Sequence, residues 1–280
     1  MSDDTLEAWG QRWNTKAKAD VAFSPEDALL NPTSIEMGIP ALDLMLGGGI
    51  PRGRTSMFFG EPSTGKTLLA QRVIAAAQKQ GGRAMFDGLE TVRPEVMVVD
   101  SIPALVPQAM LEAEMEKQDF RGLAARKITE GVAKATQYNQ TTALIFINQL
   151  RTDLGKTFGN PEKLPGGKAL KFHVSLIVRV RRGQWLTEAD VAEDEMPDLD
   201  TVLESDKEPK RIGFMLRLRT EKNKLAPPEQ STSIKFYFNG RVDPMGSLVH
   251  LAIQRGVIEG TRGYYEVPGV DGKVHGFSAV

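Results

Sequence analysis

Residues 60–67 read GEPSTGKT, and this stretch decides the fold that we expect. It matches the phosphate-binding pattern G-x-x-x-x-G-K-[ST] in full. Gly60 and Gly65 allow backbone angles that other residues avoid, so successive amides can point toward phosphate oxygens. A helix that begins near Lys66 adds the positive end of its dipole. Lys66 itself can reach the β- and γ-phosphates, and the Thr67 hydroxyl can bind Mg²⁺.

The sequence around this loop favours a nucleotide site over a chance glycine-rich turn. An apolar run at 55–59 predicts a buried strand before the loop, and residues 67–80 predict a helix after it. A second apolar run, VMVVD at 96–100, ends in Asp100, which either holds Mg²⁺ through water or is merely an acid at a strand end. We expect ATP and Mg²⁺ as cofactors, bound by Gly60, Glu61, Pro62, Ser63, Thr64, Gly65, Lys66, Thr67 and Asp100, with Thr67 and Asp100 at the metal.

Strands alternate with helices along the central part of the chain. Further apolar runs predict strands, and longer periodic segments predict helices. This order predicts an α/β fold with a mostly parallel central sheet flanked by helices. The remaining predicted strands lie at 83–87, 143–148, 172–180 and 213–219, and a second helix lies at 122–138.

Three segments fall outside this alternation. Residues 1–34 carry an apolar stripe at helical spacing, which predicts a helix that packs on its own domain or an arm that docks on a neighbouring subunit. Residues 186–209 are acidic and predict a solvated hairpin or loop, or a segment that competes with DNA for a basic surface. Residues 247–280 predict a small helix and a glycine-rich end. The expected division is therefore 1–34, a core at 35–246, and a short C-terminal region at 247–280.

Composition restricts the class of protein. The net charge is −1, so any nucleic-acid binding must depend on local positive charge. The absence of cysteine excludes disulfides and thiolate metal sites. No apolar stretch approaches the ~20 residues that a membrane span needs, and the acidic N-terminus lacks a signal-peptide pattern. We expect a cytoplasmic protein.

Beyond the phosphate-binding loop, the chain resembles the bacterial and phage RecA recombinases over roughly residues 35–90 and 95–265. The resemblance implies a RecA-like P-loop NTPase core. The matching motifs occur in the family's order: LGGGIPRGR at 46–54, VVDSIPAL at 98–105, GLAAR at 122–126, FINQLR at 146–151, FGNPE at 158–162, ALKF at 169–172 and EKNK at 221–224.

The resemblance implies an ATP-dependent recombinase that forms filaments on single-stranded DNA, then pairs them with duplex DNA for strand exchange in recombination and repair. Gln149 would contact the γ-phosphate and report it to the DNA loop that follows. Lys222 and Lys224 would enter the ATP site of the adjacent subunit and stabilise the transferring phosphate. Lys171 and Phe172 resemble residues at that subunit interface.

The resemblance also implies two DNA loops, at about 112–121 and 151–167. Leu154 would insert between base triplets, and paired glycines would let the backbone approach phosphates. Each basic residue alone could instead be a solvated surface group. The implied DNA-binding residues are Arg121, Arg126, Arg151, Leu154, Gly166, Gly167 and Lys168.

One departure from the family bears on hydrolysis. Only residues 88–95 separate two predicted strands, whereas the family has a much longer segment and a parallel crossover normally takes about a dozen residues or more. Either a segment is absent, which we favour, or the strands are joined differently. Leu89 occupies the position of the family's catalytic glutamate, and Glu90 could orient the attacking water instead. The segment offers no aromatic residue to stack on adenine, and the short C-terminal region weakens the case for duplex capture.

The sequence leaves two rival functions open. A ring-shaped helicase or motor could share the same core, and a non-catalytic regulatory paralogue would suit Leu89 and the short connection. The ALKF and EKNK motifs favour the recombinase over the ring motor.

Overall fold

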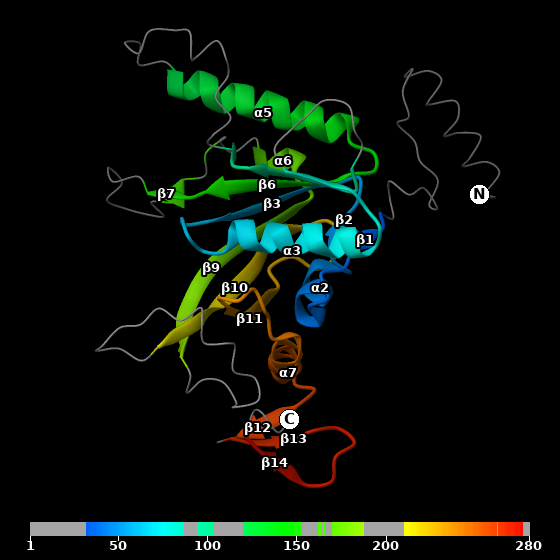
Figure 1. Cartoon of the computed structure of the whole chain (residues 1–280), viewed down its shortest axis with the longest axis vertical. Coiled ribbons are helices and arrows are strands. Elements are labelled where there is room, and N and C mark those ends of the chain that lie inside the picture. Colours follow the sequence, from blue (N-terminus) through cyan, green and yellow to red (C-terminus); the bar gives the residue numbers. More distant parts are fainter. Residues whose placement is uncertain are drawn as a thin grey trace, which may run out of the picture.

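The computed structural model describes residues 32–86, 94–102, 120–152, 162–163, 165, 170–187, 210–261 and 263–276. Its centre is a seven-stranded sheet of order β11-β10-β9-β3-β6-β5-β4 (Figure 1). Neighbouring strands from β9 to β4 run parallel, and β9, β10 and β11 pair antiparallel. The predicted α/β class with a mostly parallel sheet is confirmed. The strands are β3 (Thr55–Gly60), β4 (Ala84–Phe86), β5 (Val96–Asp100), β6 (Ala143–Gln149), β9 (Leu176–Thr187), β10 (Arg211–Asn223) and β11 (Ser231–Tyr237).

Helices cover both faces of this sheet (Figure 1). Helix α3 (Lys66–Lys79) and the short α2 (Pro40–Leu46) lie on one face, and α5 (Phe120–Tyr138) and α6 (Leu170–His173) lie on the other. Successive residues of a strand point to opposite faces, so β3 contributes to two cores. Phe58 packs in the core that contains α3, whereas Met57 and Phe59 pack in the core that contains α5 and α6.

The structure corrects two predicted element boundaries. The strand predicted at 172–180 begins only at Leu176, because residues 170–173 form helix α6, with Leu170 buried and Phe172 76% exposed. Arg121 was expected in a DNA loop, but it lies in helix α5, which begins at Phe120. The N-terminal stripe, residues 112–119 and the acidic segment 188–209 lie outside the described residues.

Shorter strands lie around the core. Strand β1 (Ser34–Ile35) pairs with β2 (Ile50–Pro51), and β7 (Arg151–Thr152) pairs with β8 (Glu162–Lys163). The C-terminal region contains helix α7 (Pro244–Gln254) and a three-stranded sheet. The sequence did not predict this sheet, because runs of three residues are too short to show alternation. Its strands are β12 (Glu259–Thr261), β13 (Tyr264–Glu266) and β14 (Lys273–His275).

Strands β4 and β5 are parallel neighbours, with Ala84 paired to Val96. Only residues 87–95 separate them in the sequence, which is fewer than a parallel crossover usually takes. The sheet therefore brings these two strands together despite the short connection. In the part of the chain that the structure describes, no helix is long and apolar enough to cross a membrane.

Replacement of Gly49 by alanine tests the turn before the nucleotide loop. Gly49 has φ +114, and an added Cβ would lie 2.2 Å from the Ile35 carbonyl oxygen. Gly81 is the matched control, since its φ is +80 but nothing lies within 4 Å of its Cβ position. Backbone strain alone should cost Gly81→Ala about 1 kcal/mol. The added clash should cost Gly49→Ala about 2 kcal/mol more. Urea denaturation of both variants measures the difference, and equal losses of stability would contradict it.

Candidate nucleotide-binding site

The phosphate-binding loop connects the end of β3 at Gly60 to the start of α3 at Lys66. Gly65 caps the helix in the left-handed conformation, at φ +91. At Gly60 a Cβ would lie 2.1 Å from the Val180 carbonyl oxygen, so only glycine fits there. The structure therefore forms the strand, loop and helix that this sequence pattern requires.

Lys66 is enclosed by the loop. Its side chain is buried, and Nζ donates hydrogen bonds to the Glu61 carbonyl oxygen at 2.6 Å and to Thr64 Oγ1 at 3.4 Å. Burial lowers the pKa of Lys66 below its ordinary 10.5, and the charges of Asp100 and Glu61 oppose this shift. An anion bound in the loop would satisfy this desolvated cation.

Thr67 and Asp100 lie together at the mouth of the loop. The Thr67 hydroxyl donates a 2.6 Å hydrogen bond to Asp100 Oδ2. A hydroxyl and a carboxylate are the oxygen donors that Mg²⁺ prefers. These two residues come from α3 and from the end of β5, and their donor set fits Mg²⁺. No group of three or more His, Cys, Asp or Glu side chains suited to a metal occurs among the described residues.

Gln149 lies at the end of β6, beside the first residue of the loop. It pairs with Gly60 in the parallel register of β3 and β6, and its side chain is exposed. The next amide, that of Leu150, donates a 2.9 Å hydrogen bond to the Gly60 carbonyl oxygen. The structure thus places Gln149 beside the start of the nucleotide loop.

The sequence analysis missed Asn148, which is fully buried. Its Nδ2 donates a 2.9 Å hydrogen bond to the Pro165 carbonyl oxygen, inside the predicted DNA loop 151–167. A polar residue within the apolar run LIFIN was the signal that could have identified it, since buried amides need partners. Asn148 therefore ties the end of β6 to this loop.

Other predicted DNA and catalytic residues are only partly placed. Arg151 lies in β7, paired with Lys163, so the base of the loop is a short ladder. Arg126 is exposed and forms a 3.0 Å ion pair with Glu130, one turn along α5. The remaining predictions, on Glu90, Leu154, Gly166, Gly167 and Lys168, lie outside the described residues.

Of the two lysines of the EKNK motif, Lys222 lies near the end of β10 and against α6, and Lys224 directly follows the strand. Lys222 Nζ donates hydrogen bonds to the carbonyl oxygens of Lys171, at 2.6 Å, and Phe172, at 3.4 Å. Burial and, secondly, the charge of Lys224 lower the pKa of Lys222. Lys224 is exposed. Lys222 therefore lies next to the main chain of Phe172, whose side chain is exposed.

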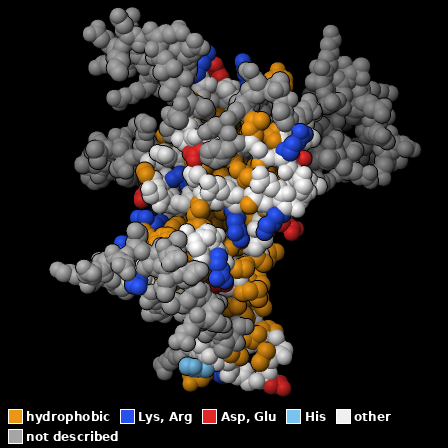
Figure 2. All heavy atoms as spheres, in the orientation of Figure 1, with side chains coloured by type: hydrophobic (Ala, Val, Ile, Leu, Met, Phe, Trp, Pro, Cys, Tyr) orange, Lys and Arg blue, Asp and Glu red, His pale blue; other side chains and the backbone are white. Residues whose placement is uncertain are grey.

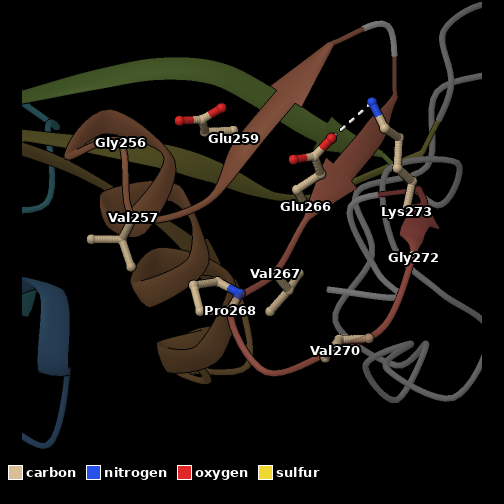
Figure 3. Close-up of a pocket in the computed structure, with 9 residues that line it drawn as sticks. All are labelled: Gly256, Val257, Glu259, Glu266, Val267, Pro268, Val270, Gly272 and Lys273. Carbon is tan, nitrogen blue, oxygen red and sulfur yellow. Dashed lines mark ion pairs between the residues drawn. The ribbon is translucent and has the colours of Figure 1, made fainter.

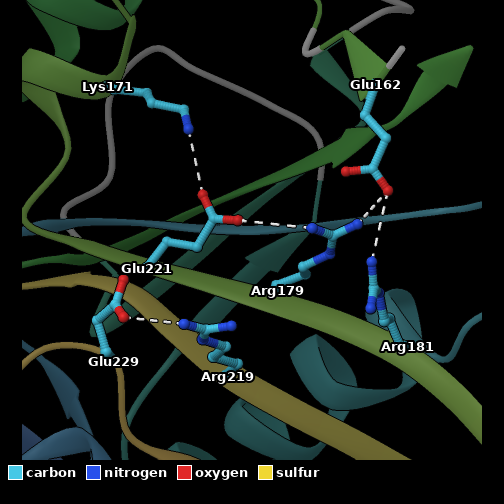
Figure 4. Close-up of polar contacts among 7 residues, drawn as sticks. All are labelled: Glu162, Lys171, Arg179, Arg181, Arg219, Glu221 and Glu229. Atoms are coloured by element: carbon cyan, nitrogen blue, oxygen red, sulfur yellow. Dashed lines mark hydrogen bonds and ion pairs between the residues drawn. The ribbon is translucent and has the colours of Figure 1, made fainter. Parts of the chain in front are cut away.

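The structure reveals an arginine cluster that the sequence analysis missed. Arg179 pairs with Arg219 across β9 and β10, and Arg181 pairs with Arg217. Arginines at alternate positions of two strands were the available signal. Figure 4 shows the carboxylates that neutralise part of this charge, including Glu229, which lies 2.9 Å from Arg219. Like charges opposite each other destabilise a sheet, so the cluster suits an anionic partner.

A hollow of about 500 Å³ lies in the C-terminal sheet, where Glu266 and Lys273 form a 2.8 Å ion pair (Figure 3). It lies at the opposite end of the molecule from α5, beyond α7 (Figure 1). It is not part of the nucleotide site. Figure 2 shows hydrophobic side chains on the surface between the core and this end of the molecule.

The strand, loop and helix around Lys66, together with the sheet order, define a P-loop nucleotide-binding protein. The sequence model of the RecA N-terminal domain matches residues 24–95 and 89–243. The chain belongs to the RecA family, whose members are ATPases.

Three curated relatives, each named Protein RecA, illustrate this similarity. The protein of Thermus thermophilus is 38% identical over 267 residues, covering 80% of this chain and 73% of the relative. That of Clostridium acetobutylicum is 32% identical, covering 84% and 73%, and that of Heliobacterium modesticaldum is 32% identical, covering 95% and 85%. Since 80% of 280 residues is about 224, about 43 of the 267 positions in the Thermus alignment hold no residue of this chain.

The Lys66→Met variant tests the energetic cost of the buried ammonium. Because the pKa is lowered only in the folded state, the unfolded chain binds this proton more tightly. Burial therefore destabilises the fold at neutral pH, and the cost falls as pH rises from the lowered pKa to the ordinary 10.5. Without nucleotide, Lys66→Met should be more stable than the wild type at neutral pH by about 1 kcal/mol, and the difference should shrink as the pH approaches 10.5.

Urea denaturation at a series of pH values measures this difference. Lys79→Met is the control, because Lys79 is an exposed lysine of the same helix. A Lys66→Met protein less stable than the wild type, or a pH-independent difference, would contradict the prediction.

Proposed function

We propose that this protein is an ATP-dependent recombinase that forms filaments on single-stranded DNA and promotes pairing and strand exchange with duplex DNA in the cytoplasm. The observation that carries the proposal is the contact of β3 with β6. The residue that begins the phosphate-binding loop, Gly60, lies beside Gln149, and the predicted DNA loop begins two residues later. Bound nucleotide and bound DNA would therefore both contact the same edge of the sheet, where β3 and β6 end.

ATP would be held by the backbone amides of residues 60–67 and by Lys66. On binding, the phosphates would take over the hydrogen bonds that Lys66 now makes to the loop itself. Thr67 and Asp100 would hold Mg²⁺, which neutralises phosphate charge during transfer. Gln149 would detect the γ-phosphate through its exposed amide.

The signal to DNA would pass through two short links. The Leu150 amide is bonded to Gly60, and the Asn148 side chain is bonded to the Pro165 carbonyl oxygen. A shift of Gln149 toward the γ-phosphate would move both links. The loop would then present Arg151, Leu154 and the segment containing Gly166, Gly167 and Lys168 to the DNA strand.

DNA would be held through its phosphates, without sequence readout. The exposed arginines Arg181, Arg217 and Arg219 provide a second positive surface beside the loop, because Arg181 also lies 3.5 Å from Glu162 of β8. These arginines would supply the local positive charge that DNA binding needs in a protein whose net charge is −1. Arg126 would contribute only after release from Glu130, and Arg121 would act from helix α5 rather than from a loop.

Hydrolysis would require an adjacent subunit. Lys222 and Lys224 would enter the neighbour's ATP site, where developing negative charge favours two cations. Lys222 is already partly desolvated and, among the described residues, is held by two carbonyl oxygens, which a phosphate oxygen can replace. The exposed ring of Phe172 beside it would pack against that neighbour.

We infer that the segment around residues 88–95 is shorter than in the relatives and that Glu90 orients the attacking water. The two separate matches of the family model, which overlap at 89–95, support a shortened segment. With Leu89 at the position of the family's catalytic glutamate, hydrolysis would be less efficient than ATP binding would suggest, and adenine stacking by the family's mode would be absent.

Nucleotide-dependent DNA binding is the direct test of the recombinase. A fluorescent single-stranded oligonucleotide should bind about tenfold more tightly with a non-hydrolysable ATP analogue and Mg²⁺ than without, since allosteric couplings are commonly of this size. The Lys66→Ala variant should lose the difference. Fluorescence anisotropy measures both affinities. Equal wild-type affinity in the two conditions would exclude the recombinase.

Salt titration and electron microscopy complete this test. Arg217→Gln should reduce the slope of log affinity against log salt by about 1, whereas Lys79→Gln should leave it unchanged.

Electron microscopy then separates the rival functions. Filaments on the oligonucleotide support the proposal, and closed rings would favour a helicase-like motor. DNA binding that is the same in Lys66→Ala as in the wild type would favour a regulatory paralogue.

Mixing two inactive variants tests whether Lys222 acts between subunits. Lys66→Ala loses its own ATP site but keeps Lys222, and Lys222→Ala has the reverse defect. In an equal random mixture about a quarter of the head-to-tail interfaces should combine an intact site with an intact lysine. DNA-stimulated ATPase should therefore recover to about a quarter of the wild-type rate. No recovery, with both variants still joining filaments, would show that Lys222 does not act in trans.

A further inference from the structure

Arg179 lies where the segment of Glu162, the end of β10 and the strand before the phosphate-binding loop meet. Its guanidinium forms an ion pair with Glu162 of β8, at the far end of the DNA loop (Figure 4). It also lies 3.9 Å from Glu221 of β10, the residue before Lys222. Through the β3–β9 register it is paired with Phe59, and its Cζ is 5.8 Å from the centre of that ring, directly before Gly60.

The Arg179 side chain is only 16% exposed, and its Nε is a buried donor with no hydrogen-bond partner in the described structure. Burying a cation is costly unless carboxylates compensate for the lost water. Two carboxylates share this one cation, Glu162 in close contact and Glu221 at a longer distance. A displacement of Glu162 would leave Glu221 as the nearer compensating charge. Arg179 would then pair with Glu221 more closely.

Glu221 can transmit such a shift because of a bulge in β10. The register with β9 changes between Thr220 and Lys222. Adjacent strand residues normally point to opposite faces, but a bulge re-aims a side chain. Both Glu221 and Lys222 therefore reach Lys171 of α6. Glu221 binds its ammonium at 3.1 Å, and Lys222 binds its carbonyl oxygen at 2.6 Å.

We propose that Arg179 is a positioning residue that couples the Glu162 end of the DNA loop to Lys222 through Glu221. This inference rests on the proposed function, in which the loop binds DNA and Lys222 acts at a neighbouring ATP site. DNA phosphates arriving at the loop repel the Glu162 carboxylate and weaken its contact with Arg179. Arg179 then draws Glu221 away from Lys171, which loosens the carbonyl oxygens that hold Lys222. The lysine becomes available to the neighbouring ATP site only when DNA is bound.

The first test measures this coupling without DNA or ATP. Hydrogen exchange of the peptide 220–226 is followed in the full-length wild type, Glu162→Gln and Arg179→Gln. The control is Glu266→Gln, whose carboxylate pairs with Lys273 in the C-terminal sheet. Loss of the Glu162 charge should change the exchange rate of this peptide by at least about fivefold, which is the lower end of common allosteric couplings. The control variant should leave that rate unchanged. Equal exchange in Glu162→Gln and the wild type would overturn the inference.

The second test separates positioning from a merely structural effect. Arg179→Gln should reduce the stimulation of ATPase by single-stranded DNA at least about fivefold, through kcat, while KM for ATP stays within about twofold. Arg179→Lys should restore part of the stimulation, because it keeps the charge but cannot contact both carboxylates with a planar fork. Normal stimulation in Arg179→Gln, or an equal loss of ATP binding, would overturn the proposal. A wild type without DNA stimulation would instead refute the proposed function, and exchange at 220–226 would then decide the inference alone.

Discussion

The parallel register between β3 and β6 is the constraint on which the rest of the structure depends. It places Gly60 beside Gln149 and allows the Leu150 amide to bond the Gly60 carbonyl oxygen. The phosphate-binding loop leaves one strand and the predicted DNA loop leaves the other at the same edge of the sheet. Two segments about 90 residues apart in sequence are therefore joined at the same edge of the sheet. A movement of one strand end is felt by the other.

Two lysines, one at each edge of the sheet, are held in a similar way. Lys66 is buried and Lys222 is half-buried, and both donate to main-chain carbonyl oxygens. A neutral carbonyl oxygen compensates a buried ammonium less well than an anion does. Burial accordingly lowers the pKa of each lysine. Such cations favour an incoming phosphate, Lys66 within its own chain and Lys222, on our proposal, in the neighbouring one.

Much of the fold could be predicted because its strands are buried on both faces and read as continuous apolar runs. The runs at 55–59, 96–100 and 143–148 are strands in the structure. Other features escaped prediction because they depend on contacts between distant segments. Helix α6 was read as strand, since four residues cannot reveal a helical period. Asn148 is bonded to the distant Pro165, and Arg179 contacts Glu162 and Glu221, each more than 15 residues away.

The sequence by itself determined the phosphate-binding loop, the class of fold and the family, because these depend on residue types at fixed local spacing. Gly65, at φ +91, is required by the local conformation of the backbone, whereas Gly60 is also required by the nearby Val180 carbonyl oxygen. Only the tertiary structure decided which charges meet. The pairing of β9 with β10 aligns Arg179 with Arg219, and the bulge at Glu221 turns two neighbouring side chains toward α6. Strand register and bulges are set by packing across the sheet, and residues distant in sequence decide that packing.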